Sequence, residues 1–118
     1  MPTPADLLLL RDKLREFAAA RDWDQFHSPK NLSMALMVEV AELMEHFQWL
    51  TEEQSSVLPT ENKQAVSEEL ADILLYLVRL SDKLDVDLLA AALRKIDKNA
   101  LKYPAEQVRG SAKKYSDY

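Results

Sequence analysis

The chain of 118 residues is long enough for one domain with a single hydrophobic core. A net charge of −5 disfavours a general nucleic-acid binder, and the absence of cysteine excludes disulfide scaffolds, zinc ribbons and cysteine nucleophiles. One glycine and five prolines favour long helices over hairpin-rich sheets, so the expected fold class is all-α. No signal segment and no apolar run of membrane-spanning length is visible, so we expect a soluble, cytoplasmic protein.

Two helices are predicted in the first half of the chain. Thr3 before a proline is typical of a helix cap, and apolar spacing continues that helix over about 4–21. Ser28 followed by Pro29 repeats the same signature. It predicts a second helix over about 29–50.

A third helix is predicted after a polar loop. Residues 51–60 lack apolar periodicity and are expected to form that loop. Thr60 can cap a helix over about 61–84, in which apolar residues recur at helical spacing.

A fourth helix and a tail complete the expected order. Asp85 or Asp87 can cap this helix, which should end near Tyr103 because a proline follows. Four such helices predict an up-and-down bundle core in a domain of residues 1–104. Residues 105–118 are polar and without periodicity, so we expect a mobile or partner-dependent tail.

Acidic side chains lie on the apolar faces of the second and third helices. Glu39 falls in the middle of the apolar stripe of its helix, and Glu42 lies one turn further at its edge. The same pair recurs thirty residues later as Glu69 and Asp72. Antiparallel packing of the two helices would bring the pairs face to face. The ordinary alternative is that these acids are simply solvated, but solvated glutamates belong on the polar face of a helix.

Inward carboxylates repel one another unless a cation lies between them. Ligands with oxygen atoms alone favour a hard ion, so we expect Mg²⁺, with Mn²⁺ as the alternative. A di-iron bundle would require a histidine three residues after an acid on two helices. Glu45 and Leu75 stand at those positions, which disfavours iron.

Four blocks of sequence resemble one family. They are RDWDQFHSPKNL (21–32), EVAELMEHFQW (39–49), EELADILLYL (68–77) and KIDKNALKYP (95–104). In this order they resemble the MazG-like all-α nucleoside triphosphate pyrophosphohydrolases, and most closely the dCTP pyrophosphatase branch. The resemblance implies magnesium-dependent conversion of a nucleoside triphosphate, with dCTP or a modified dCTP favoured, to the monophosphate and pyrophosphate.

The resemblance also assigns roles to residues. The metal ligands would be Glu39, Glu42, Glu69 and Asp72, and either Glu39 or Glu42 would orient or deprotonate the attacking water. The substrate-binding residues fall into three groups. The base would contact Trp23, His27, Trp49 and Tyr76, which without the resemblance would be interpreted as core aromatics. The phosphates would contact Lys95, Asn99 and Lys102, and Tyr103 would close the pocket. Lys30 and Asn31 are weaker candidates for phosphate contacts. The fourth block lacks the arginines common in relatives, so the phosphate contacts could differ.

Both central helices are apolar nearly all round and must be covered on every side. The residues outside the acid-bearing stripes are Met34, Met37, Val40 and Met44 on one helix and Leu70, Leu74, Leu75 and Val78 on the other. We therefore expect a homo-oligomer, dimer or tetramer, and the resemblance favours the tetramer.

Other functions stay open at this point. A house-cleaning pyrophosphatase for non-standard triphosphates and a phosphoribosyl-ATP pyrophosphohydrolase share the acid pattern. A non-catalytic helical interaction module whose acids bind structural cations is the alternative from a different class. Neither nucleic acid nor membrane is an expected partner.

Overall fold

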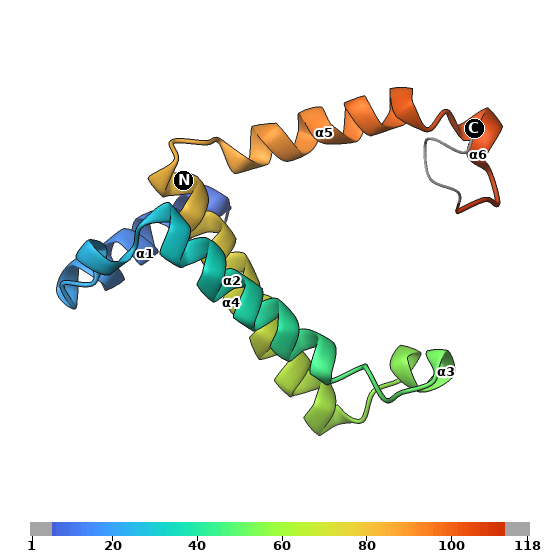
Figure 1. Ribbon diagram of the computed structural model, residues 1–118, viewed down its shortest axis with the longest axis horizontal. Coiled ribbons are helices and arrows are strands. Elements are labelled where there is room, and N and C mark those ends of the chain that lie inside the picture. The colour runs from blue at the N-terminus through green and yellow to red at the C-terminus, as the bar shows by residue number, and fades with distance from the viewer. Residues whose placement is uncertain (1–5, 113–118) are drawn as a thin grey trace, which may run out of the picture. The chain divides into compact units, whose positions relative to one another are not determined.

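The computed structural model describes residues 6–112, and every regular element in that range is a helix (Figure 1). The predicted all-α class is confirmed. The chain divides into two compact units, Met1–Val86 and Asp87–Tyr118. No described helix is both long and apolar enough to cross a membrane.

The first helix, α1, spans Leu7–Ala20. Its cap is Asp6, whose carboxylate accepts hydrogen bonds from the amides of Leu8 and Leu9 at 3.0 and 3.2 Å. The predicted start at residue 4 is therefore wrong, because the Asp6 carboxylate satisfies the free amides of the first turn three residues later. The predicted cap Thr3 lies outside the described residues.

The second helix, α2, spans Pro29–Glu45 and follows a short 3₁₀ helix, η1, at Asp24–Phe26. The predicted cap is confirmed, since the Ser28 hydroxyl accepts from an amide at 3.1 Å. The predicted end near residue 50 is wrong. The amides of His46, Phe47 and Leu50 donate to carbonyls three residues back, and such tightening ends the α-helix.

A helix not predicted from the sequence, α3, spans Glu52–Ser56 within the expected loop. Thr51 and Gln54 form a capping box at its start, in which each side chain accepts from the other residue's amide. The following helix, α4, spans Thr60–Lys83. Thr60 is its first residue rather than its cap, so that part of the prediction is wrong. Pro59 occupies the cap position with an extended backbone and no side-chain bond.

The long helix α4 is the centre of the first unit. It packs against α2, which runs antiparallel to it, and against α1 (Figure 1). The buried apolar side chains in this unit are Ala18, Leu32, Val66 and Val78. They hold the three helices together and fix the acid-bearing faces of α2 and α4 opposite each other.

The second unit contains helix α5, Leu88–Lys102, and the single turn α6, Ala105–Val108. The Asp87 carboxylate caps α5 by accepting from the Ala90 amide at 3.0 Å, which decides between the two predicted caps. The turn α6 is not predicted from the sequence. Asp85 instead has a φ of 55° in the left-handed region, just after the end of α4. The place of α5 in a four-helix bundle stays a prediction.

Candidate functional site

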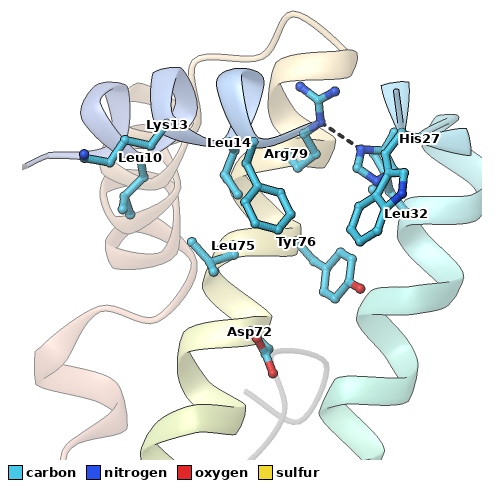
Figure 2. A pocket seen from close by; sticks show the side chains of 11 residues that line it. Leu10, Lys13, Leu14, His27, Leu32, Asp72, Leu75, Tyr76 and Arg79 are labelled. Atoms are coloured by element: carbon cyan, nitrogen blue, oxygen red, sulfur yellow. Dashed lines mark hydrogen bonds between the residues drawn. The ribbon is translucent and has the colours of Figure 1, made fainter. Parts of the chain in front are cut away.

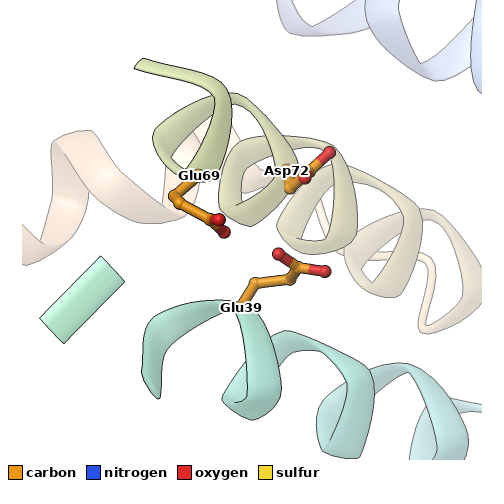
Figure 3. Close-up of side chains that lie close together, drawn as sticks. All are labelled: Glu39, Glu69 and Asp72. Carbon is orange, nitrogen blue, oxygen red and sulfur yellow. The ribbon is translucent and has the colours of Figure 1, made fainter. Parts of the chain in front are cut away.

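Three carboxylates meet between α2 and α4. Glu39 on α2 faces Glu69 on α4, and Asp72 lies one turn further along α4 (Figure 3). One oxygen from each of the three carboxylates lies within 4.8 Å of the others. We call these three residues the acid cluster. Its spacing would let a single cation contact all three side chains.

The acid cluster lacks compensating charge. Oε2 of Glu39 and Oε2 of Glu69 are buried and accept no hydrogen bond. Among residues 6–112, no ion pair involves a member of the cluster. A buried carboxylate oxygen without a partner is costly unless a proton or a cation compensates it.

The pKa of Glu39 agrees with the burial of the acid cluster and its lack of compensating charge. Burial and, after it, the neighbouring carboxylates of Glu69, Glu42 and Asp72 together raise the pKa of Glu39 to about 7. Glu42 is half-buried on α2, one turn after Glu39, but it is not part of the tight group of three. It is therefore close enough to act on Glu39 and distinct from the acid cluster.

A cavity of about 400 Å³ adjoins the acid cluster (Figure 2). Asp72 belongs to both, and Tyr76 follows it by one turn of α4. Most of the lining is apolar or aromatic. The remaining lining residues are Leu10, Lys13, Leu14 and Phe17 of α1, Trp23 and His27 on either side of η1, Leu32 of α2, and Leu75 and Arg79 of α4.

Flat rings form one wall of this cavity. Trp23 meets Phe17 edge to face with ring centroids 5.7 Å apart, and it meets His27 in the same way at 6.5 Å. On the α4 side, burial and the negative charges of the acids raise the pKa of Tyr76, so its phenol stays protonated. The cavity therefore offers ring faces and a neutral hydroxyl within one helical turn of a carboxylate.

Arg79 is a lining residue that the sequence analysis did not assign to the site. Its side chain is only 7% exposed and has three polar partners. Nε donates to Nδ1 of His27 at 3.1 Å, Nη2 donates to Asp24 at 2.6 Å, and Nη1 lies 3.6 Å from Asp82. A signal was present, because Arg79 follows Asp72 by two helical turns and so shares its face of α4.

Comparison with known proteins bears on the identity of this site. A model of the MazG-like family matches residues 34–118. The dCTP pyrophosphatase 1 of Mus musculus is 48% identical over 118 residues, which cover 98% of this chain and 68% of that protein. The dCTP pyrophosphatase 1 of Homo sapiens is 46% identical over 119 residues, with the same coverage.

The chain belongs to the MazG-like family. The resemblance stated from four sequence blocks is thereby confirmed. The fold agrees as well, since the crystal structure of a pyrophosphatase from Archaeoglobus fulgidus superposes with a TM-score of 0.80 at 39% identity. That alignment covers 88% of this chain and 97% of the archaeal one.

Three predicted substrate-binding residues of this MazG-like chain, Lys30, Asn31 and Trp49, do not line the cavity. Lys30 and Asn31 are exposed in the first turn of α2, and neither lines the cavity. The side-chain amide of Asn31 donates to the backbone carbonyl of Phe26 at 3.0 Å, so it holds η1 against the start of α2. Trp49 is 87% exposed after the end of α2. Their predicted contacts with substrate stay predictions.

The remaining predicted residues of the MazG-like chain belong to the second unit. Lys95, Asn99 and Lys102 share one face of α5, since their spacing is four and three residues. Tyr103 ends the helix, and its amide donates to the Asn99 carbonyl at 2.8 Å. A role of these residues in phosphate binding stays a prediction.

Proposed function

We propose that this chain is a magnesium-dependent nucleoside triphosphate pyrophosphohydrolase that converts dCTP, or a modified dCTP, to the monophosphate and pyrophosphate. The identity of 46–48% with proteins named dCTP pyrophosphatase 1, over nearly the whole chain, supports this activity. The enzyme class predicted from the sequence is confirmed at this level. Mn²⁺ is the alternative metal.

One observation carries the proposal: the unpaired buried oxygens of Glu39 and Glu69 face each other beside a cavity. Their donor set contains oxygen alone, which fits Mg²⁺ better than zinc or copper. Glu39, Glu69 and Asp72 would hold the ion, with Glu42 as the fourth ligand expected for the family. A bound Mg²⁺ would lower the pKa of a coordinated water and offset the charge of the phosphates.

The carboxylates would also handle the proton of the attacking water. Glu39 and Glu42 are the two candidates. Glu42 lies outside the tight group of three, so its oxygens are less committed to an ion there. We assign to Glu42 the orientation of the water and the acceptance of its proton, and to Glu39 a place among the residues that would hold the ion.

The cavity would receive the base. Its volume of about 400 Å³ is within the range of small-molecule pockets. Trp23, His27 and Tyr76 would contact the ring of the base. The phosphates would lie at the end of the cavity where Asp72 is. We extend the phosphate site to Lys95, Asn99, Lys102 and Tyr103, and the base site to Trp49, with Lys30 and Asn31 as weaker phosphate contacts.

The complete enzyme would be a homo-oligomer, and we propose a tetramer. Met34, Met37 and Met44 on α2 are each more than half exposed, as is Leu70 on α4. Two further residues expected on the oligomer surface lie elsewhere: Leu75 lines the cavity, and Val78 is buried in the core. Each protomer would complete its four-helix bundle with α5. A stable, well-folded monomer in light scattering would contradict the oligomer.

The activity is tested with a panel of triphosphates. We expect pyrophosphate and dCMP from dCTP in the presence of Mg²⁺, and neither product when EDTA removes the metal. Faster turnover of oxidised or otherwise non-standard triphosphates than of dCTP or 5-methyl-dCTP would favour the house-cleaning alternative. Failure to hydrolyse any triphosphate with Mg²⁺ or Mn²⁺ would contradict the proposal.

A further inference from the structure

The hydrogen bond between Arg79 and His27 fixes the protonation of the histidine ring. A guanidinium group has donors and no acceptor. Nδ1 of His27, which receives Nε–H of Arg79 at 3.1 Å, must therefore carry a lone pair. The ring is then neutral, with its proton on Nε2.

We propose that Arg79 is a positioning residue for base recognition, which holds the His27 ring so that Nε2–H donates a hydrogen bond to an acceptor atom of the pyrimidine. The inference rests on the proposed function, because it assumes that the base enters the cavity that His27 lines. Within the described part of the chain, Nε2 has no hydrogen-bond partner of its own. It points away from Nδ1 across the ring and is free to bind a ligand.

The surroundings of the ring favour this single state. Burial lowers the pKa of His27, and the positive charges of Arg79 and Lys83 lower it further, against an opposing effect of Asp24. The other charged or titratable groups lining the cavity are Lys13, Asp72 and Tyr76. A second proton on the ring would have to displace the Arg79 donor from Nδ1.

Arg79 also fixes the backbone that carries the ring. Its Nη2 donates to Asp24, the first residue of η1, while the amide of His27 donates to the Asp24 carbonyl at 3.1 Å. One guanidinium thus holds both ends of the segment from Asp24 to His27. Without it, the ring could exchange tautomers and present a lone pair to the acceptor edge of the base, which would repel it.

The first test is the tautomer of His27. In ¹⁵N NMR spectra of the whole protein at pH 7, we expect a protonated Nε2 and an unprotonated Nδ1. In Arg79→Met, both tautomers should appear and the pKa of His27 should rise, because a nearby positive charge is lost. Arg15→Met is the matched control, since Arg15 bonds Asp82 of the same network without touching His27. It should leave the tautomer unchanged. A wild-type ring protonated on Nδ1, or charged at pH 7, overturns the inference even if no variant folds.

The second test is kinetic. Loss of one neutral hydrogen bond should raise KM for dCTP about three- to tenfold in Arg79→Met, with a smaller change in kcat. His27→Gln places an amide donor near the position of Nε2–H and needs no partner at Nδ1. In the His27→Gln background, Arg79→Met should therefore cause no further rise in KM. Equal effects of Arg79→Met in both backgrounds would show a purely structural role and overturn the inference.

The two proposals fail separately. Wild-type protein that hydrolyses no triphosphate defeats the proposed function, and the kinetic form of the inference with it. Wild-type protein that is active, while Arg79→Met keeps both its KM and a single His27 tautomer, defeats the inference alone.

Discussion

Two groups of charged residues, each with members on helix α4, differ in how their charges are balanced. The acid cluster joins Glu69 and Asp72 of α4 to Glu39, and it contains negative charge alone. About two turns further along α4, acids and bases are mixed. The members of this second group, which we call the ion network, are Arg15, Asp24, Arg79, Asp82 and Lys83.

The ion network is complete within the chain, whereas the acid cluster is not. Arg79 has three partners, and the Asp82 carboxylate bonds Nε and Nη2 of Arg15. Glu39 and Glu69 each have a buried oxygen that has no hydrogen-bond partner. A complete network supports the fold and orients the cavity wall, while an incomplete one requires something from solution. We infer from this difference a structural role for one end of the shared face of α4 and a chemical role for the other.

The largest expected effect comes from the acid cluster. Glu39→Gln removes a charged ligand while keeping its shape, so we expect kcat/KM for dCTP to fall at least about 100-fold while the protein stays folded. Pyrophosphate release measures the rate, and circular dichroism checks the fold. Glu45→Gln is the control, since Glu45 is exposed at the end of the same helix and should retain full activity. Equal rates in the two variants would remove Glu39 from the site.

The next effect concerns stability and belongs to the ion network. The Asp82 side chain is only 12% exposed, and its loss would leave Arg15 and Arg79 short of an acceptor. We expect Asp82→Ala to lower the free energy of unfolding by about 1–3 kcal/mol, as measured in urea. Asp12→Ala, which breaks exposed pairs with Arg11 at 3.0 Å and with Arg15 at 3.9 Å, should cost less than about 0.5 kcal/mol. Similar losses in both variants would refute a structural role specific to the network.

Magnesium should stabilise the protein through the acid cluster. At ten times its Kd, an ion that binds only the folded state contributes about 1.4 kcal/mol. For a chain of this size, Tm should rise by about 3–6 °C. Differential scanning calorimetry of the wild type and of Glu69→Gln, with and without Mg²⁺, checks this. A rise of the same size in Glu69→Gln would locate the ion elsewhere.

The smallest expected effect is a pH dependence in metal-free protein. The pKa of Glu39 is raised to about 7, above the ordinary value of 4.5, so the folded state binds this proton more tightly than the unfolded state. Its contribution to stability is therefore present below about pH 4.5 and is lost as the pH rises to 7. In EDTA, the wild type should lose stability over this window relative to Glu39→Gln. A difference that stays constant with pH would contradict the raised pKa.

Local signals in the sequence predicted most of the helices. Ser28 before Pro29 and Asp87 before an apolar run are caps whose chemistry acts within one turn, so no tertiary information is needed. The end of α2 was missed because Phe47 and Leu50 continue the apolar spacing after the backbone has tightened. The capping box of α3 was visible in the sequence as a threonine followed three residues later by a glutamine.

The candidate site divides in the same way. Helical periodicity predicted that Glu39 and Glu69 would turn inward, because burial of one stripe follows from the spacing alone. The bond from Arg79 to His27 joins residues 52 positions apart and depends on how η1 packs against α4. Nor could spacing show that Phe17 of α1 lines the cavity, since that depends on how α1 packs against α4. The packing of η1 and of α1 against α4 is therefore what the sequence left open.

Tyr76 links the cavity to the acid cluster through its phenol. Burial raises the pKa of this phenol, and the charges of Glu39, Asp72 and Glu42 raise it further. A cation that neutralised those charges would shift the ionisation back, while a base stacked in the cavity would change the environment of the same ring. The alkaline titration of this phenol, separated from that of the other three tyrosines by comparison with Tyr76→Phe, thus gives an intrinsic signal for a cation at the acid cluster.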